Sequence, residues 1–303
     1  MLDRRAFTLG ASLTAAASFC GGAARAQVVA RAGLGKAEIL VLSDGGFQLP
    51  LSMIARDTPL PQLEAMTGSK GPAETVLNVT CLKRGSETIL FDCGAGAHFL
   101  AGSGKLAASL EAAGIAPDSV SHVVFTHLHP DHLWGALDEF DSPAFPNATW
   151  LAARDEVAFW TDAKVYERLS EDRHAFAAGA QRVLKGLQDG LKTFAAGEEV
   201  LPGIAAVATP GHTPGHVSFE IKDGSDRLLV LGDAATHPVA SFAHPEWRPA
   251  SDHDPDQAVQ TRKTVLGRAA DEKLRVIGYH LPKGGIGTVE RTGQAFRFIP
   301  SAA

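Results

Sequence analysis

The residues Thr126–His132 read Thr-His-Leu-His-Pro-Asp-His, so three imidazoles and one carboxylate fall within six positions. They follow a β-branched and apolar run at 122–125, which predicts a buried strand that ends where the polar side chains begin. His127 and His129 are two residues apart, so an extended backbone would direct both side chains to one side, where they could bind one ion together. Pro130 ends the strand, and the aspartate and histidine after it could reach a second position close by. Nitrogen and carboxylate ligands without thiolate suit zinc, and also iron, manganese or cobalt.

The alternative interpretation is a polar loop in which histidines cluster by chance. A single pair at this spacing would carry little weight, but four ligand-type side chains at the end of one buried strand favour a metal site. The pattern also recurs further along the chain, because an apolar run at 206–208 leads through a turn to His212.

Two further strand ends carry candidate ligands. A short apolar run at 227–231 ends in Gly232-Asp233, where a carboxylate could bridge two cations that would otherwise repel each other. A last buried strand at 274–278 leads to His280. Because an α/β protein places its site at the ends of its strands, these residues are expected to meet at one edge.

The stretch 126–132 resembles the H-x-H-x-D-H signature of the metallo-β-lactamase superfamily, and the other family motifs follow in the expected order between about 42 and 300. Among its branches, the chain most resembles the secreted methyl parathion hydrolase-like group, which is related to the quorum-quenching lactonases. The resemblance implies an α/β fold, the four-layer αβ/βα sandwich with two mixed β-sheets face to face and helices outside.

The resemblance also implies a division of the ligands between two divalent metal ions, for which zinc is the expected element. One metal would be held by His127, His129 and His212, the other by Asp131, His132 and His280, and Asp233 would be shared.

Two such cations can hold a bridging hydroxide by lowering the pKa of its parent water, so no side-chain nucleophile is required. Asp233 would fix the metal bridge and Asp131 could relay a proton, which makes both candidate catalytic residues. The favoured activity is hydrolysis of organophosphate triesters or aryl esters. The alternatives are a lactonase, acyl-homoserine lactones included, then a thioesterase, a β-lactamase, or a zinc-binding protein without turnover.

Two residues are candidates for supporting the ligands. By the resemblance, Asp92 would lie behind the metals and orient a ligand histidine, although a simple turn-forming aspartate is an equal alternative. His216 leads into a strand at 217–221 and is better explained as a supporting or core histidine than as a ligand.

Aromatic residues between 154 and 194 are the candidates for substrate binding. By the resemblance, Phe159, Trp160 and Phe176 would line the pocket, with ordinary core packing as the alternative for each. The related lactonases carry a tyrosine soon after the shared aspartate that helps to hold the substrate. This chain has only Tyr279 between Asp233 and His280, which counts against the acyl-homoserine lactonase alternative without excluding it. A histidine such as His237, an arginine or water could serve instead, and the role of His237 stays open.

Cys81 and Cys93 flank a predicted β-hairpin with its turn at 84–86. In that register Cys81 lies opposite about Leu90, so a disulfide across the hairpin is not expected, and both thiols are interpreted as buried and free.

The first 26 residues are predicted to be a twin-arginine-type export signal, because Arg4-Arg5 precedes an Ala-rich apolar segment and Ala24-Arg25-Ala26 has the form of a cleavage site. An uncleaved anchor is the alternative. Residues 27–303 are then predicted to form one hydrolase domain, periplasmic or secreted, with a formal charge of −8. An acidic chain argues against a nucleic-acid partner and lacks a polybasic membrane patch. A small-molecule ester or lactone is the expected partner, and the oligomeric state is open, a homodimer included.

Overall fold

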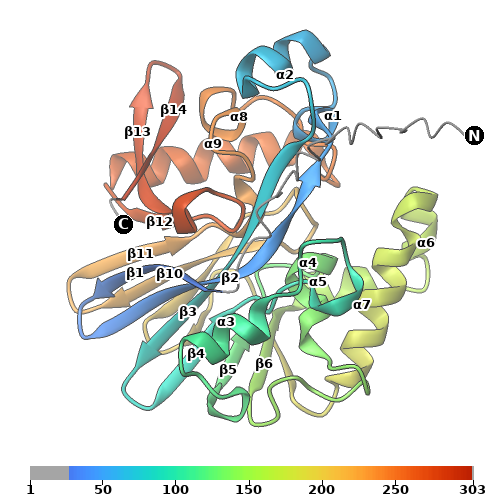
Figure 1. Ribbon diagram of the computed structural model, residues 1–303, viewed down its shortest axis with the longest axis vertical. Helices are drawn as coiled ribbons and strands as arrows, with labels where there is room; N and C mark the ends of the chain where they lie inside the picture. Colours follow the sequence, from blue (N-terminus) through green and yellow to red (C-terminus); the bar gives the residue numbers. More distant parts are fainter. Residues whose placement is uncertain (1–26, 302–303) are drawn as a thin grey trace, which may run out of the picture.

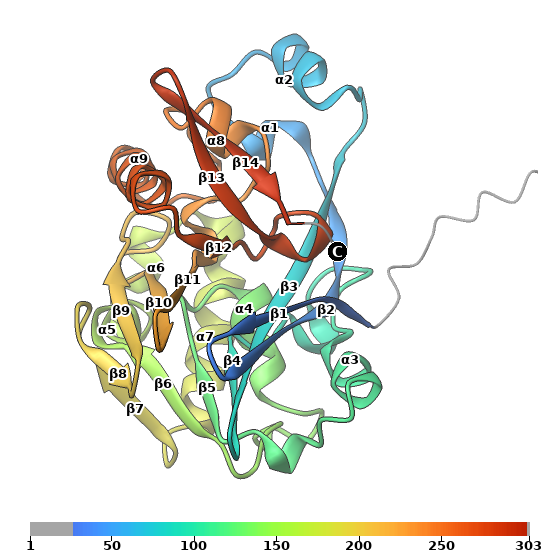
Figure 2. The ribbon, with the colours of Figure 1, turned by 90° about the vertical axis from the view of Figure 1, so that its left-hand side faces the viewer.

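The computed structural model describes residues 27–301 and contains two seven-stranded β-sheets. The sheets pack face to face and helices cover their outer faces, so the layers run α, β, β, α (Figure 1, Figure 2). The predicted αβ/βα sandwich is therefore confirmed.

The first sheet contains the first seven strands in sequence order. Its first four strands pair antiparallel and its last four pair parallel, so the sheet is mixed. The strands are β1 (Val28–Leu34), β2 (Ala37–Leu49), β3 (Ala73–Arg84), β4 (Glu87–Phe91), β5 (His122–Val124), β6 (Thr149–Ala153) and β7 (Leu191–Phe194).

The second sheet has the order β14-β13-β12-β11-β10-β9-β8 and is mixed as well, because β11 and β12 are parallel and the other pairs are antiparallel. The strands are β8 (Glu199–Leu201), β9 (Ile204–Ala208), β10 (Val217–Asp223), β11 (Asp226–Val230), β12 (Arg275–Ile277), β13 (Ile286–Thr292) and β14 (Ala295–Pro300).

The helices lie on the outer faces of the sheets and in the loops around their shared edge (Figure 1). Within residues 27–301, none of them is long and apolar enough to cross a bilayer. They are α1 (Leu51–Ile54), α2 (Leu60–Thr67), α3 (Leu106–Ala112), α4 (Pro130–Leu133), α5 (Arg154–Thr161), α6 (Val165–Arg168), α7 (His174–Gly186), α8 (Ala240–Ala243) and α9 (Pro255–Asp271).

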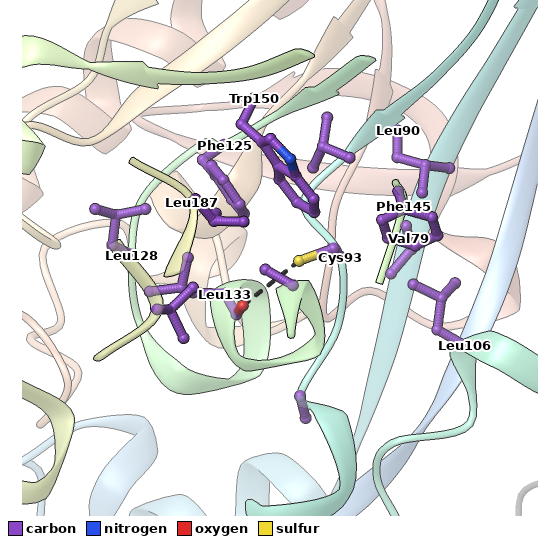
Figure 3. Close-up of a cluster of buried hydrophobic side chains, with 14 of the residues drawn as sticks. Val79, Leu90, Cys93, Leu106, Phe125, Leu128, Leu133, Phe145, Trp150 and Leu187 are labelled. Carbon is purple, nitrogen blue, oxygen red and sulfur yellow. Dashed lines mark hydrogen bonds between the residues drawn. The ribbon is translucent and has the colours of Figure 1, made fainter. Parts of the chain in front are cut away.

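Three layers of apolar contacts hold the sandwich together. Between the sheets, Phe91 and Phe219 meet with ring centroids 5.4 Å apart. Outside the first sheet, the rings of Phe125 and Trp150 stack at 6.0 Å within the cluster that Figure 3 shows. A third cluster joins the second sheet to α9. Truncating a buried aromatic such as Phe219 to alanine would cost about 3 to 5 kcal/mol.

The hairpin of β3 and β4 has the predicted register, with Cys81 opposite Leu90. Both Cys81 and Cys93 are buried and free, as expected. Burial raises the pKa of the Cys81 thiol to about 12, and the Cys93 thiol donates to the carbonyl oxygen of His132 at 3.4 Å. Neither thiol is therefore a reactive group at neutral pH.

Helix α7 is shorter than the apolar periodicity predicts. The spacing of Phe176, Leu187 and Leu191 favours one continuous helical face, but α7 ends at Gly186 and Leu191 is the first residue of β7. Leu187 still packs in the outer core. The predicted export signal, residues 1–26, lies outside the described residues, so its cleavage and the periplasmic or secreted location stay predictions.

Candidate metal centre

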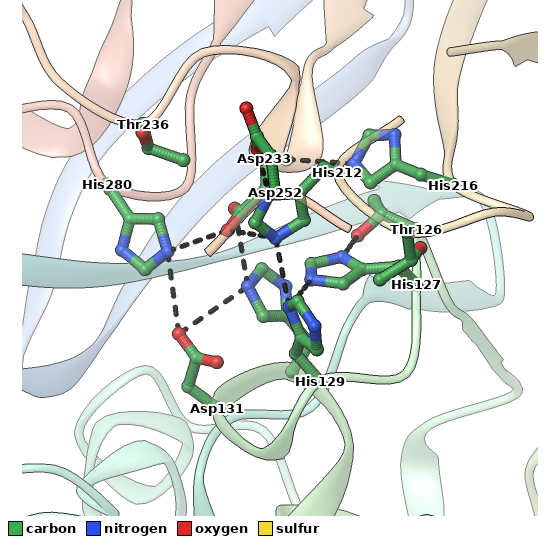
Figure 4. Close-up of polar contacts among 12 residues, drawn as sticks. Thr126, His127, His129, Asp131, His212, His216, Asp233, Thr236, Asp252 and His280 are labelled. Carbon is green, nitrogen blue, oxygen red and sulfur yellow. Dashed lines mark hydrogen bonds and ion pairs between the residues drawn. The ribbon is translucent and has the colours of Figure 1, made fainter. Parts of the chain in front are cut away.

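The predicted ligands meet at the edge where strands from both sheets end, although they lie up to 153 positions apart in sequence (Figure 4). The loop after β5 carries the stretch 126–132, and the loops after β9, β11 and β12 carry His212, Asp233 and His280. Close packing of these loops requires a glycine before Asp233. Gly232 has a φ of 54°, and a Cβ there would lie 2.7 Å from Nε2 of His216.

The first ligand group consists of His127, His129 and His212. Nδ1 of His129 lies 3.1 Å from Nε2 of His127 and 2.9 Å from Nε2 of His212. Three imidazole nitrogens from two loops therefore converge on one point, and all three rings are buried.

The second ligand group consists of Asp131, His132 and His280. Oδ2 of Asp131 lies 3.6 Å from Nε2 of His132 and 3.4 Å from Nε2 of His280. The hydroxyl of Tyr279 donates to the backbone oxygen of Asp131 at 2.7 Å, which fixes the start of α4 against the loop that bears His280.

Asp233 lies between the two groups, as predicted for a shared ligand. Its Oδ2 is 3.2 Å from Nε2 of His212 in the first group and 3.2 Å from Nε2 of His280 in the second. Its Oδ1 lies 3.3 Å from Nε2 of His132. His216 supports this position, because its Nε2 accepts a hydrogen bond from the Asp233 backbone N–H at 3.0 Å.

Every ligand histidine has a partner for the nitrogen that points away from the centre. Nδ1 of His127 is 3.1 Å from the Thr126 hydroxyl, and Nδ1 of His280 is 3.0 Å from the Val76 carbonyl oxygen. The remaining three pairs are His129 with His253 at 3.1 Å, His132 with Asp92 at 2.9 Å and His212 with Asp252 at 2.9 Å. Such partners fix ring orientation and tautomer in metal sites.

The donor set fits two divalent cations. When the ring nitrogen that points away from the centre donates to an oxygen, as Nδ1 of His212 does to Asp252, the other nitrogen of the neutral ring presents a lone pair toward the centre. In the described part of the chain, Nε2 of His132 and Oδ1 of Asp233 are buried and face each other but make no hydrogen bond. A buried polar atom without a partner destabilises the fold, and bound cations would give both atoms a partner.

The pKa values of the ligand histidines reflect burial and the nearby carboxylates. Burial lowers the pKa of His127 and of His129 well below the usual value, so both are neutral near pH 7. Burial also opposes protonation of His212, but Asp233 and Asp252 outweigh it and raise the pKa of His212 to about 9. Cation binding would therefore have to displace a proton from His212.

Asp92 is placed behind both ligand groups rather than in a simple turn. Its Oδ2 accepts from Nδ1 of His132 at 2.9 Å and from the Thr126 hydroxyl at 2.8 Å. The same hydroxyl faces Nδ1 of His127, so one carboxylate supports a histidine from each group. Asp92 has a φ of 64°, an uncommon conformation that the surrounding hydrogen bonds over-determine.

Glu156, a buried carboxylate on α5, carries no sequence motif that predicts its place behind the candidate ligands. It accepts hydrogen bonds from the backbone N–H groups of Leu128 at 3.0 Å and Gly215 at 2.9 Å. It also accepts from the Thr213 hydroxyl at 2.7 Å and from Nε1 of Trp160 at 2.8 Å. Glu156 thus ties the loop that bears His127 and His129 to the loop that bears His212. The pair Glu156 and Trp160, one helical turn apart, is the only local signal for this arrangement.

The segment 249–254 contacts the candidate ligands as well. The sequence assigns His253 no role, but its Nε2 lies 3.1 Å from Nε2 of His129. Burial lowers the pKa of His253 to about 3, so the ring is neutral. Asp252 is fully buried between His212 and Arg262, with its Oδ2 3.1 Å from the guanidinium. No motif in the sequence marks either residue.

A cavity of about 280 Å³ is lined by residues of both ligand groups, among them His129, Asp131 and Asp233. Its walls are mostly apolar, and Arg173 is their only cation with a permanent charge. The walls also include Phe47, Phe99, Phe176, Thr236 and His237.

Only one of the three aromatic residues predicted to line the pocket does so. Phe176 lines the cavity, with its ring 5.8 Å from that of His129. Trp160 is 0% exposed, and its indole N–H is held by Glu156, so it belongs to the core. Phe159 packs against Trp160 and His253 behind the cavity wall. Both predictions are corrected because α5 directs the Trp160 ring toward His129 and the Phe159 ring toward His253, and neither ring lines the cavity.

Comparison with known proteins gives a family and several relatives. The model of the metallo-beta-lactamase superfamily matches residues 74–280. The N-acyl homoserine lactonase AttM of Agrobacterium fabrum (strain C58) is 34% identical over 132 residues, 42% of this chain and 45% of that protein. The N-acyl homoserine lactonase AiiA of Bacillus thuringiensis subsp. kurstaki is 26% identical over 164 residues, 54% of this chain and 57% of that protein. The chain thus spans about half the length of the curated relatives it matches.

Solved structures match over nearly the whole fold. AidC, described as a dizinc quorum-quenching lactonase in complex with a product, superposes with a TM-score of 0.87 and 27% identity, covering 92% of this chain and 98% of that chain. A hydrolase of the beta-lactamase superfamily, AbOPH, superposes with a TM-score of 0.85 and 28% identity, covering 92% of this chain and 99% of that one.

Proposed function

The chain belongs to the metallo-β-lactamase superfamily, and on that premise we propose that it is a metal-dependent lactonase that holds two zinc ions. One observation carries the proposal: residues of both ligand groups line a single, largely apolar cavity. Relatives that are themselves described as lactonases support this activity better than hydrolysis of organophosphate triesters, which the sequence analysis had favoured.

Two zinc ions, when bound, would supply a water of lowered pKa as the nucleophile and would polarise the carbonyl oxygen of the substrate. Residues of the chain would transfer the proton and orient the substrate. Asp131 lines the cavity, where it can accept the proton of the attacking water and pass it to the alkoxide that leaves when the ring C–O bond breaks. The product is then a hydroxycarboxylate.

Hydrogen-bond donors in the cavity wall would orient the substrate. Nδ1 of His237 accepts from the backbone N–H of Ala240 at 3.0 Å and of Val239 at 3.2 Å, so its proton lies on Nε2. Burial lowers the pKa of His237 to about 4, which keeps the ring a neutral donor near pH 7. His237 would thus take the place of the tyrosine expected in related lactonases. Arg173 and Thr236 offer further donors to oxygens of the acyl group.

The apolar wall favours substrates with a hydrocarbon chain. Phe47, Phe99 and Phe176 line the same cavity as the ligand groups, where burial of each methylene would contribute about 0.8 kcal/mol. The same wall would accept an aryl ester, so hydrolysis of aryl esters or phosphotriesters is a side activity to be measured and not the main proposal.

The test is turnover of the zinc-loaded protein on an acyl-homoserine lactone, a γ-lactone, a 4-nitrophenyl ester and paraoxon. The proposal expects the lactones to lead in kcat/KM, and His129→Ala to abolish turnover of all four substrates. A leading kcat/KM for paraoxon would make the protein a phosphotriesterase with a lactonase side activity. Tight binding of two zinc ions without turnover of any substrate would support a zinc-binding protein instead.

A further inference from the structure

Each of the five candidate ligand histidines has a partner at the ring nitrogen that points away from the centre, and the partner of His129 differs chemically from the other four partners. Thr126, Val76, Asp92 and Asp252 each present an oxygen to a ligand histidine, whereas His129 meets the ring nitrogen of another histidine. That histidine, His253, directly follows Asp252, which holds His212. Two consecutive residues therefore contact two of the three histidines of the first ligand group, one from each motif.

We propose that Asp252 and His253 are a positioning pair that fixes the rings of His212 and His129 and thereby sets the cation affinity of the first ligand group. The inference rests on the cation binding in the proposed function, but not on the identity of the substrate. It assigns no contact with substrate to either residue, because both act through the histidines that they hold.

The backbone of the pair is held firmly enough to act in this way. The N–H of His253 donates to the carbonyl oxygen of His212 at 3.1 Å, and the N–H of Asp254 donates to that of Gly211 at 2.9 Å. The guanidinium of Arg56 donates to three carbonyl oxygens of the same segment, including that of Asp252 at 3.1 Å. The pair cannot move without breaking these contacts.

The side chains are fixed as well. Asp252 accepts from Arg262, a buried residue of α9 that also donates to the carbonyl oxygen of Trp247 at 2.9 Å. The ring of His253 packs edge-on against those of Phe159 and Trp160, at centroid distances of 5.4 and 5.7 Å. These two aromatic residues, which do not line the cavity, thus confine the ring that supports His129.

A cation at Nδ1 of His129 would require the proton of that neutral ring to lie on Nε2. Nε2–H of His129 then donates to Nε2 of His253, which carries its own proton on Nδ1. Nδ1 of His129 is left as a lone pair directed at Nε2 of His127 and of His212. Loss of the acceptor at 253 would release the ring of His129 and weaken that convergence.

The experiment compares His253→Phe with His253→Gln. Phenylalanine keeps an aromatic ring against Phe159 and Trp160 but accepts no hydrogen bond, whereas the glutamine side chain keeps an acceptor oxygen. His122→Phe is the matched control, because His122 is a half-buried histidine at the start of β5, away from the ligands. Zinc affinity is measured by competition with a chelator, which resolves two dissociation constants, together with the visible spectrum of the cobalt-loaded protein and the Tm of the metal-free protein.

For His253→Phe we expect one of the two zinc dissociation constants to rise about 10- to 100-fold, while the other and the metal-free Tm stay near those of the unmodified protein. His253→Gln should keep most of the affinity, and only His253→Phe should alter the cobalt spectrum. Unchanged affinities in His253→Phe would overturn the inference. Equal weakening of both sites together with a lower metal-free Tm, or failure of His253→Gln to restore affinity, would overturn it too. If the unmodified protein binds no zinc, the proposed function fails as well, which distinguishes the two results.

Discussion

Replacing Glu156 with glutamine should destabilise the fold by an amount that its hydrogen bonds define. Oε1 of Glu156 accepts from Leu128 N–H and from the indole of Trp160, and Oε2 accepts from the Thr213 hydroxyl and from Gly215 N–H. A glutamine keeps one oxygen and replaces the other with an NH₂ group, so one pair of partners must face a donor.

The glutamine oxygen is expected at the Oε1 position, because both partners there are obligatory donors. At the Oε2 position the Thr213 hydroxyl can rotate and accept, which leaves only Gly215 N–H unpaired. A buried unpaired donor costs about 1 to 3 kcal/mol. Burial raises the pKa of Glu156 despite its four hydrogen bonds, so loss of the charge itself adds nothing to this cost. The expected loss is thus about 1 to 3 kcal/mol of a total that is typically 5 to 15 kcal/mol.

The assay is urea unfolding of the metal-free protein, with Glu167→Gln on the exposed face of α6 as the matched control. Measurement without metal separates the hydrogen-bond effect from cation binding. A change below about 0.5 kcal/mol, which is the usual range for surface substitutions, would refute the assignment of Glu156 as the tie between the two ligand loops. Glu156→Leu would leave all four donors unpaired and should not fold.

Three further predictions concern the shared candidate ligand, the cavity and Glu220, a buried carboxylate on β10. Asp233→Asn should lower kcat at least about 10²-fold by loosening the ligand that both groups share, and near-normal kcat with two zinc ions bound would contradict this. Phe176→Ala should raise KM for long-chain lactones about tenfold while zinc content stays constant, and KM measured against chain length checks it. Hydrogen bonds from Arg227 and Arg268 outweigh burial and lower the pKa of Glu220 from 4.5 to about 2. Glu220 therefore stabilises the fold above pH 4.5 by about 1 to 2 kcal/mol after allowance for solvent screening. This stabilisation should be lost as the pH falls from 4.5 to 2, as measured by urea titrations of the metal-free protein. The Glu220→Gln variant should not show this loss.

The convergence of the candidate ligands could be predicted because their positions are encoded locally. His127 and His129 are two positions apart after a buried strand, and His212, Asp233 and His280 follow three other strands that end at the same edge. The hairpin register follows for the same reason, because a tight turn at Gly85 fixes which residues face each other across β3 and β4.

The supporting residues could not be predicted because their contacts are not local. His253 lies 124 positions from His129, and Glu156 lies 59 positions from Gly215. A helical pattern identifies the apolar face of α5 but not what packs against it, which is why Trp160 was assigned to the cavity and lies behind it. Only the fold shows that a buried carboxylate on that helix faces two ligand loops.

The distribution of ligands between the sheets has a consequence for stability. The loop after β5 in the first sheet supplies His127 and His129 to one group and His132 to the other, while His212 and His280 come from loops of the second sheet. Each cation would therefore cross-link the two sheets and not merely order one loop. Because a ligand that binds only the folded state stabilises it by RT ln(1 + [L]/Kd), zinc should raise the Tm of the whole sandwich in one cooperative transition. A variant with one weakened zinc site should lose part of that gain without losing cooperativity, since the remaining cation would still join both sheets.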